Sequence, residues 1–448
     1  MKKIIALLMA MVLVLALAAC GEEAATEPKT TEGAEATEGT AGTEPAGTEP
    51  AGTEPAGTEP AAAAELKVGA IYINSKNDTA GYTFAHHSGI TAAMTELGLD
   101  PATDLVIVDE VPEDKQQVLD AIDILVGSDC DIIFGISFGY IDAFTAAAEE
   151  YPEVIFSHAT GYMANETNFN NYFGRIYQAR YLAGIAAGLK SLEMGNNNIG
   201  YVAAHTTDYA ETASGINGFA LGVQAVNPDA AIYVKNLNNW ADEINEKAFA
   251  EELISAFGCG VVSQHCDSAQ PQIAAQNAGV FGCGYNSDMT GDAPAAHLTA
   301  AIWNWNVYYR TAMEAAIACE GDAAAFVENM GGNAYFGGLA EGFVDVSPLT
   351  ENCAAGTEEA IAAVKALMVN GEWDVFSGVK LNITVAEDGT VTVEKVEAAM
   401  ESNGFMYADG NFAVAMDNAV VIEAGAAAID DGVIKGSMNW LVKGVSES

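Results

Sequence analysis

The chain has 448 residues, 50% of them hydrophobic, and a formal net charge of −45 at pH 7. This length is too great for one ordinary domain and leaves room for two lobes with sizeable buried cores. The strong negative charge argues against nucleic acid and against multiply anionic ligands, because both would be repelled. A neutral or weakly cationic small molecule is left as the type of ligand.

The first 20 residues have the pattern of a secretory signal peptide. Lys2 and Lys3 precede an apolar run from Ile4 to Ala19, and Cys20 follows at the expected cleavage point. A Cys at that point is typical of bacterial lipoproteins, in which it becomes the lipidated first residue. An ordinary signal peptide with a chance Cys is the alternative. We expect an extracytoplasmic protein that lipid chains on Cys20 hold at the cell membrane.

A low-complexity spacer is expected to follow, at residues 21–64. GTEPA-type units repeat from Gly42, and a composition of Gly, Thr, Glu and Pro cannot bury a core. The spacer holds ten Glu and one Lys, and the signal holds two Lys, so residues 61–448 carry −38 of the total charge. The folded part is therefore strongly acidic by itself.

From Leu66 onward, strand patterns alternate with helix patterns. The expected strands are 67–73, 105–111, 131–137, 154–158, 199–204, 231–237, 259–265 and 280–286, and the expected helices are 81–97, 118–126, 143–150, 211–226, 244–257 and one near Ile273. Such alternation predicts parallel strands joined by crossover helices. Because the series restarts after a polar, aromatic run, we expect two doubly wound parallel-sheet lobes of the α/β class.

Three crossings between the lobes are expected, at about 170–174, 286–289 and 303–305. This division assigns 66–173 plus 289–303 to the first lobe and 174–288 plus 304–448 to the second. A three-strand hinge of this kind can bend as a unit and close the lobes around a ligand.

The C-terminal region has a weaker pattern. Residues 335–346 indicate strand and turn, 358–369 a helix, and 376–393 a hairpin with Asp388-Gly389 at its tip. Residues 394–436 mix Ala, Gly and acidic side chains, and we expect them to elaborate the second lobe.

Six cysteines follow Cys20, and none is spaced as CxxC. A zinc knuckle is therefore not indicated, and no other metal site is expected. Cys130, Cys259 and Cys283 lie in apolar strands, which favours small buried thiols. Disulfides are possible outside the cytoplasm, and the sequence does not choose among their pairings.

Several blocks in order resemble the basic membrane protein, or PnrA-like, family of lipoprotein substrate-binding components of ABC importers. These blocks, within residues 66–346, are GAIYINSKNDTAGYTFAHHSG, ISFGYIDA, HATGYM, YFGRIYQARYLAGIAAG, GYVAA, SGINGFALG, NPDA, QHCDS, GYNSDM and HLTAAIWNW. The resemblance implies a type I periplasmic-binding-protein fold, a purine nucleoside or related heterocycle held between the lobes, and delivery to a membrane permease. It implies no enzymatic reaction, and hence no cofactor.

The candidate ligand contacts of the first lobe lie just after two strands. Asn77 and Asp78 can pair with the donor and acceptor edge of a heterocycle, and Tyr82 offers a flat face for stacking. The alternative for the first two is helix capping. Ser137 and Phe138 are expected to supply one polar and one apolar contact.

The second lobe offers a matching set. Trp240 is expected to stack on the ligand opposite Tyr82, each stack adding on the order of 1 kcal/mol beyond burial. Gln264, Asp267, Asn286 and Asp288 follow strand ends, where open α/β sheets bind ligands.

Two positions depart from the family pattern. Its nucleoside receptors commonly carry Asp where Asn286 stands, and where Trp303 stands they carry a Lys that helps hold the ribose. Loss of that charged pair favours a flatter ligand such as a free purine base.

Three other functions remain open. The chain could bind another heterocycle such as riboflavin, or act as a signalling receptor without transport. The segment Gly135–Gly139 also matches GxSxG, the motif of a hydrolase nucleophile, here Ser137. Arg175, at the first crossing, could contact the ligand, but we expect it to make a structural ion pair.

Overall fold

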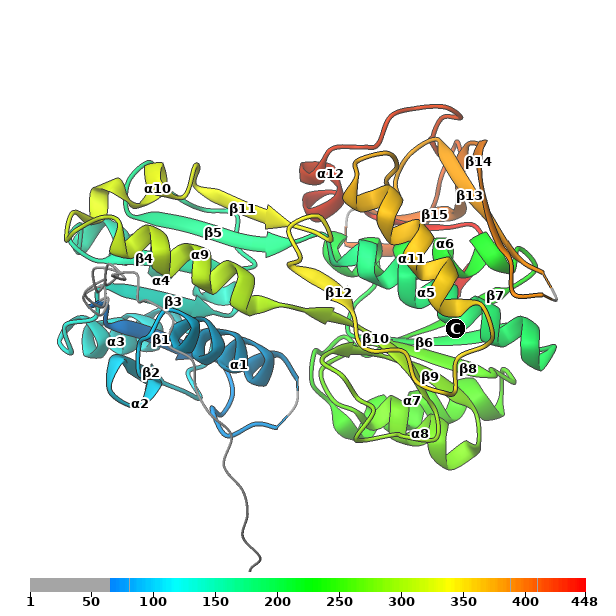
Figure 1. Cartoon of the computed structure of the whole chain (residues 1–448), viewed down its shortest axis with the longest axis horizontal. Helices are drawn as coiled ribbons and strands as arrows, with labels where there is room; N and C mark the ends of the chain where they lie inside the picture. The colour runs from blue at the N-terminus through cyan, green and yellow to red at the C-terminus, as the bar shows by residue number, and fades with distance from the viewer. Residues whose placement is uncertain (1–64, 80, 387, 409) are drawn as a thin grey trace, which may run out of the picture. The chain divides into compact units, whose positions relative to one another are not determined.

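Two parallel β-sheets organise the computed structural model, which describes residues 65–79, 81–386, 388–408 and 410–448 (Figure 1). The expected signal peptide, lipidated Cys20 and spacer lie outside these residues. Within the described chain, no helix combines the length and the apolar character that crossing a membrane requires.

The first sheet has the strand order β11-β5-β4-β3-β1-β2, and its neighbouring strands run parallel. Its strands are β1 (Val68–Tyr72), β2 (Leu105–Val108), β3 (Ile132–Ile136), β4 (Ile155–Ala159), β5 (Phe169–Gly174) and β11 (Ala334–Gly337). Its helices are α1 (Gly81–Glu96), α2 (Pro101–Asp104), α3 (Lys115–Val126), the 3-10 turn η1 (Phe138–Tyr140), α4 (Ile141–Glu150), α9 (Trp305–Ile317), η2 (Ala323–Ala325) and α10 (Phe326–Asn329).

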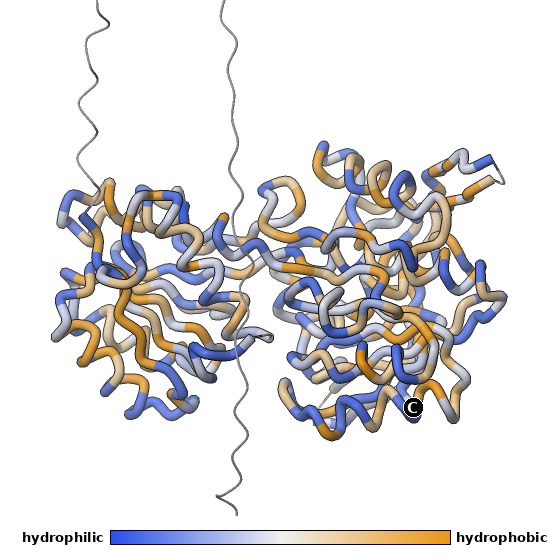
Figure 2. Tube along the Cα trace, turned by 60° about the horizontal axis from the view of Figure 1, so that its bottom comes forward, coloured by the Kyte–Doolittle hydropathy of each residue, from blue (hydrophilic) through white to orange (hydrophobic). Residues whose placement is uncertain are grey.

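Both faces of the first sheet are covered. Ala70 and Tyr72 belong to the core on the side of α1 and α9, whereas Ile71 belongs to the core on the side of α3 and α4. Figure 2 shows the resulting apolar strands inside the lobe. This two-sided burial explains why the strands read as continuous apolar runs in the sequence.

The second sheet has the strand order β12-β10-β9-β8-β6-β7-β19. Its strands are β6 (Asn198–Ala203), β7 (Ala231–Asn236), β8 (Val261–His265), β9 (Phe281–Asn286), β10 (His297–Trp303), the antiparallel β12 (Val344–Val346) and β19 (Val445–Glu447). Its helices are α5 (Ile176–Met194), α6 (Ala210–Val226), α7 (Glu243–Ser255) and α8 (Gln270–Ala278).

Glycines allow α5 and α6 to approach closely. A Cβ at Gly222 would lie 2.0 Å from the carbonyl oxygen of Tyr181, and one at Gly184 would lie 2.2 Å from that of Phe219. Either contact would force the helices apart, so a side chain is excluded at both positions. The small-residue pattern of this segment is therefore a packing requirement.

The C-terminal elements pack on the second lobe, as expected. They are α11 (Thr357–Val369), β13 (Val379–Val385), β14 (Val391–Glu397), β15 (Met400–Ala408), β16 (Asn411–Ala415), β17 (Val420–Ile422), α12 (Asp431–Gly436) and β18 (Trp440–Val442). Helix α11 contacts α5, while β13, β18 and α12 contact α6. The predicted hairpin is confirmed as the antiparallel pair β13 and β14.

The expected division into lobes is wrong in two segments. Strand β10 was expected in the first lobe, but it pairs with β9 and β12 of the second sheet. Helix α9 was expected in the second lobe, but Tyr308 stacks on Tyr172 of β5 at a ring distance of 3.8 Å, and Tyr309 contacts Phe134 of β3. The chain therefore crosses at 174–175, 303–305 and 337–344, and not at 286–289.

The described cysteines are free thiols. Cys130, Cys259 and Cys283 are buried, which confirms their expected packing role. Burial also raises the pKa of the Cys130 thiol to about 11, so this group stays protonated at neutral pH.

Charge repulsion should make stability depend on salt. Residues 61–448 carry −38, and like charges on one compact body oppose folding unless counterions screen them. We expect the melting temperature to rise by several degrees between 20 mM and about 500 mM NaCl. Scanning fluorimetry at pH 7.5 measures it, with equiosmolar sucrose as the control for general solvent effects. An equal rise in sucrose, or no rise in NaCl, would contradict this account.

Candidate functional site

The carboxyl ends of the two sheets come into contact at the start of α1. A Cβ at Gly81 would lie 2.8 Å from the carbonyl oxygen of Asp267, which follows β8 of the second sheet. The φ of Gly81 is +83°, a conformation that other residues rarely adopt. The strand-end edges of the two sheets therefore meet at this contact.

Tyr82 occupies this junction between the lobes. Its hydroxyl is buried, lies beside Thr160 and Asp267, and makes no hydrogen bond of normal geometry. Its ring contacts His86 at 4.3 Å and Trp305 at 6.5 Å, both edge-on. Burial raises the pKa of Tyr82 well above its usual value, so the phenol stays neutral. Tyr82 is thus more deeply packed than the sequence indicated.

Asn77 and Asp78 lie in the loop between β1 and α1, with Asn77 exposed and Asp78 half-buried. Partial burial raises the pKa of Asp78, and repulsion from Glu110 and Asp109 raises it further. This loop therefore presents an amide and a carboxyl group beside Tyr82.

Ser137 is engaged by a carboxylate. Its hydroxyl donates to Glu113 at 2.5 Å, and the backbone N–H of Gly139 donates to the same oxygen at 2.7 Å. His158 contacts the backbone carbonyl of Ser137, not its hydroxyl, at 2.7 Å. Burial lowers the pKa of His158 to about 4. The geometry lacks the histidine-to-hydroxyl contact that a serine nucleophile of the usual kind needs.

Aromatic side chains gather after the strands of both sheets. Phe138 and Tyr162, after β3 and β4, are 46% and 71% exposed, with ring centres 6.4 Å apart. In the second lobe, Tyr209 is 41% exposed and lies 6.2 Å from the ring of Trp240. His205 lies 5.4 Å from the same Trp240 ring.

Tyr162 and Tyr209 were not among the predicted contacts. The signal was present, because each is an aromatic residue placed soon after a buried strand. Open α/β sheets bind ligands beyond the carboxyl ends of their strands, which is the reason to consider these two residues.

Asp267 and Asn286 form a polar pair next to Trp240. The Asn286 side-chain amide donates to Asp267 at 2.9 Å, and the Asp267 backbone N–H donates to the carbonyl of Trp240 at 3.0 Å. Asn286 has a φ of +69°, and its side-chain oxygen is buried without a hydrogen bond. This backbone strain, which costs of order 1–3 kcal/mol in such residues, is typical of functional sites.

Burial raises the pKa of Asp267 to about 7, and Glu246 and Glu211 add repulsion, although the bond from Asn286 acts the other way. Near neutral pH this carboxyl group can therefore either donate or accept a hydrogen bond. That dual capacity suits a heterocycle with donor and acceptor atoms side by side.

A buried basic and acidic cluster lies beneath the second-lobe site. The Arg180 guanidinium lies 4.0 Å over the ring of Tyr285 and donates to the Tyr201 hydroxyl at 2.7 Å. His265 lies 3.0 Å from the carboxylate of Glu211. Burial alone would raise the pKa of Glu211, but His265 and Arg180 outweigh it and keep the pKa low. Sequence reasoning did not identify this cluster.

Three predicted contacts are engaged elsewhere. Gln264 donates to the carbonyl of Ser268 at 2.6 Å and accepts from Gln272 at 3.0 Å. Trp303 stacks on Trp305 at 4.6 Å. Asp288 is exposed and accepts from the backbone of Thr290 at 2.9 Å. The structure thus brings Trp240, Asp267 and Asn286 together, and it places Gly81, the neighbour of Tyr82, against the backbone of Asp267.

The raised pKa of Asp267 gives stability a defined pH dependence. Because the folded pKa, about 7, lies above the usual value of about 3.9, folding favours the protonated form. Its stabilising contribution is complete below pH ~4 and is lost as the pH rises through 7. Asn mimics the protonated group at every pH. The melting temperature of Asp267→Asn should therefore increase relative to that of the parent as the pH rises from 5 to 8.

The control is Asp242→Asn. Hydrogen bonds from Asn245 lower the pKa of Asp242, so this residue stays charged over the same pH range. The difference in melting temperature between Asp242→Asn and the parent should therefore not change with pH. Circular dichroism melts at four pH values provide the comparison. If the difference in melting temperature between Asp267→Asn and the parent did not change with pH, Asp267 could not be a buried carboxyl group with a raised pKa.

Comparison with known proteins gives a family match. Residues 66–374 match the model of the ABC transporter substrate-binding protein PnrA-like family. The chain is 36% identical over 267 residues to a putative ABC transporter glucose-binding protein from Haloferax volcanii, covering 60% of this chain and 63% of that one. It is 31% identical over 320 residues to a purine-binding protein from Brucella abortus, covering 71% and 85%.

Solved structures share the fold. A transcriptional activator of the comK gene from Bacillus halodurans aligns with a TM-score of 0.54 and 17% identity, covering 68% of this chain and 99% of that one. A solute-binding protein of an ABC transporter from Aeropyrum pernix aligns with a TM-score of 0.56 and 17% identity, covering 72% and 95%. These identities support the type I binding-protein fold alone.

Proposed function

The chain belongs to the PnrA-like family of ABC transporter substrate-binding proteins, and we propose that it binds a purine nucleobase or nucleoside between its lobes and delivers it to an ABC permease. Proteins of this family capture small molecules outside the cytoplasm for a membrane transporter. The proposal adds the ligand class, the residues that hold it and the lipid anchor at Cys20.

One observation carries the ligand class. At the junction of the two sheets, a carboxyl and amide pair, Asp267 with Asn286 at 2.9 Å, lies next to half-buried Trp240, whose ring is 6.2 Å from that of exposed Tyr209. A purine needs both features, because its faces stack on rings and its edge alternates donor and acceptor atoms. The proposed contacts are this pair with Tyr82 and Trp240, and with Asn77, Asp78 and Phe138 on loops that follow strands of the first sheet.

The free base is favoured over the nucleoside. The indole N–H of Trp303 lies 3.3 Å from the hydroxyl of Tyr285 and is buried, so this position offers no charge to a ribose. Ser137 and Gln264 are bonded within their own lobes and support the site by holding its walls. Binding and release make or break no covalent bond, so the proposal needs no cofactor.

A monosaccharide is the second candidate. The relative from Haloferax volcanii is named as a putative glucose-binding protein, and an aromatic face beside carboxyl and amide groups also suits the apolar face and hydroxyls of a sugar. The two candidates differ in how strongly they depend on stacking, because a sugar presents one apolar face and a purine presents two.

Calorimetry with adenine, adenosine and glucose separates them. We expect adenine to bind best, and Trp240→Ala to weaken its binding about 10-fold, since a lost stack and its burial together amount to ~1.4 kcal/mol. The melting temperature should change by less than about 2 °C, because Trp240 is half-buried.

Phe405→Ala is the matched control. Phe405 is 47% exposed on the C-terminal elaboration, so its loss should leave adenine binding unchanged. Glucose binding without adenine binding would replace the purine proposal with the sugar. If Trp240→Ala lowered the melting temperature as strongly as it lowered adenine affinity, the role of Trp240 would be to pack the fold and not to contact the ligand.

The lipid anchor has its own test. Cells that express the full chain should incorporate a clickable palmitate analogue into it, and Cys20→Ser should abolish both that labelling and recovery in the membrane fraction. Cys353→Ser, at a half-buried position, is the control and should leave both intact. Membrane recovery that persists in Cys20→Ser would contradict anchoring at this residue.

A further inference from the structure

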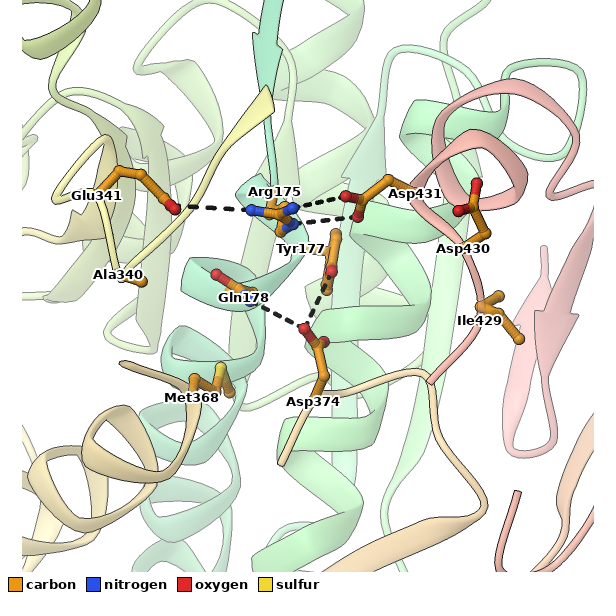
Figure 3. A pocket seen from close by; sticks show the side chains of 10 residues that line it. All are labelled: Arg175, Tyr177, Gln178, Ala340, Glu341, Met368, Asp374, Ile429, Asp430 and Asp431. Atoms are coloured by element: carbon orange, nitrogen blue, oxygen red, sulfur yellow. Dashed lines mark hydrogen bonds and ion pairs between the residues drawn. The ribbon is translucent and has the colours of Figure 1, made fainter. Parts of the chain in front are cut away.

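Arg175 stands where the chain first enters the second lobe, between β5 and α5. Its guanidinium donates to both carboxylate oxygens of Asp431, at 3.1 and 2.6 Å, and lies 3.8 Å from Glu341 (Figure 3). Bidentate pairs of this kind fix orientation as well as charge. Asp431 is 256 positions away along the chain and begins α12, in the C-terminal elaboration.

The third crossing is tied to the same place. The backbone N–H of Arg175 donates to Gly337 at 2.7 Å, and that of Leu339 donates to the side chain of Gln178 at 3.0 Å. A Cβ at Gly174 would lie 2.7 Å from the backbone oxygen of Gly337, so this approach requires glycine. The first and third crossing segments therefore lie against each other at the second-lobe end of the hinge.

Helix α12 also reaches the first lobe. Ile434 is buried and anchors the helix on the second lobe, while the Lys435 ammonium lies 4.9 Å over the ring of Phe336. Phe336 belongs to β11 of the first sheet, and the Arg175 guanidinium lies 5.5 Å from the same ring. Cation–π contacts of this type are attractive even when partly exposed. Helix α12 thus contacts the second lobe through Ile434 and the first lobe through Lys435.

A cavity of about 310 Å³ adjoins these contacts and is lined by Arg175, Asp374 and Asp431 among others. The side chains of Arg175 and Asp431 are 28% and 32% exposed. Space beside a partly exposed ion pair lets the hinge segments shift without breaking a packed core. The contacts therefore act as a restraint on a movable joint.

We infer that α12 is a brace across the hinge, in which Asp431 and Lys435 are positioning residues that favour the lobe arrangement with the strand-end edges in contact at Gly81 and Asp267. Residues beyond 374 lie outside the family match, so this chain adds control of closure to the family's two-lobed body. The brace acts on any ligand held between the lobes, because closure strengthens binding only as far as the closed arrangement is favoured.

The test measures lobe separation without ligand. Ile124 on α3 and Ile244 on α7 are 55% and 82% exposed, so spin labels at Ile124→Cys and Ile244→Cys report the distance between lobes in the full chain by pulsed electron resonance. Asp431→Asn should shift and broaden that distance distribution. Adenine affinity should fall about 5-fold, mainly through faster release. Arg175→Gln should change the distance distribution and the adenine affinity in the same way. Combining it with Asp431→Asn should add little to either change, because both variants remove the same ion pair.

Glu401→Gln is the matched control, because it breaks a 2.8 Å ion pair with Lys443 in the same elaboration, away from the hinge. It should leave the distance distribution and adenine affinity unchanged. An unshifted distribution in Asp431→Asn, or an equal shift in Glu401→Gln, overturns the brace. The distance readout does not depend on the ligand, so a shifted distribution without adenine binding would reject the purine proposal and retain the brace.

Discussion

The close approach of Gly81 to Asp267 is the contact on which the rest of the site depends. It requires a residue without a Cβ in a left-handed conformation, and it joins the first helix of one lobe to a strand end of the other. Through that contact Tyr82 comes beside Asp267, and Asp267 in turn holds Asn286 and the backbone of Trp240. Polar and aromatic groups from two separate sheets are thereby held at one junction.

Electrostatics restrict what that surface can accept. The chain is acidic throughout, and Asp267 is destabilised as an anion by burial and by neighbouring carboxylates. A ligand that brought another negative charge would add to this repulsion, whereas a neutral ligand that donates a hydrogen bond would relieve it. Arg180 and His265 lie beneath the surface and are engaged with Tyr201 and Glu211, so they stabilise its floor.

Contacts also join the crossing segments of the hinge to the C-terminal elaboration. The lobes share their crossing segments at 174–175, 303–305 and 337–344, and glycines let two of these segments lie against each other. Helix α12 then adds an ion pair and a cation–π contact around this joint. These contacts link the C-terminal elaboration to the segments that join the two lobes.

The sequence alone determined the local elements and their chemistry. Apolar runs and helical periods placed most strands and helices between residues 67 and 286 within a few residues, although they missed α2 and β5. Polar or aromatic residues after strands marked the edge where Asp267, Asn286 and Trp240 lie. Only the tertiary structure decided which sheet received β10, which lobe received α9, and that Asp431 pairs with Arg175. It also decided that Gln264 and Ser137 are bonded within their own lobes, while Tyr162 and Tyr209 stay exposed. The physical reason is that periodicity depends on neighbours along the chain, whereas strand pairing and side-chain partners depend on residues brought together from a distance.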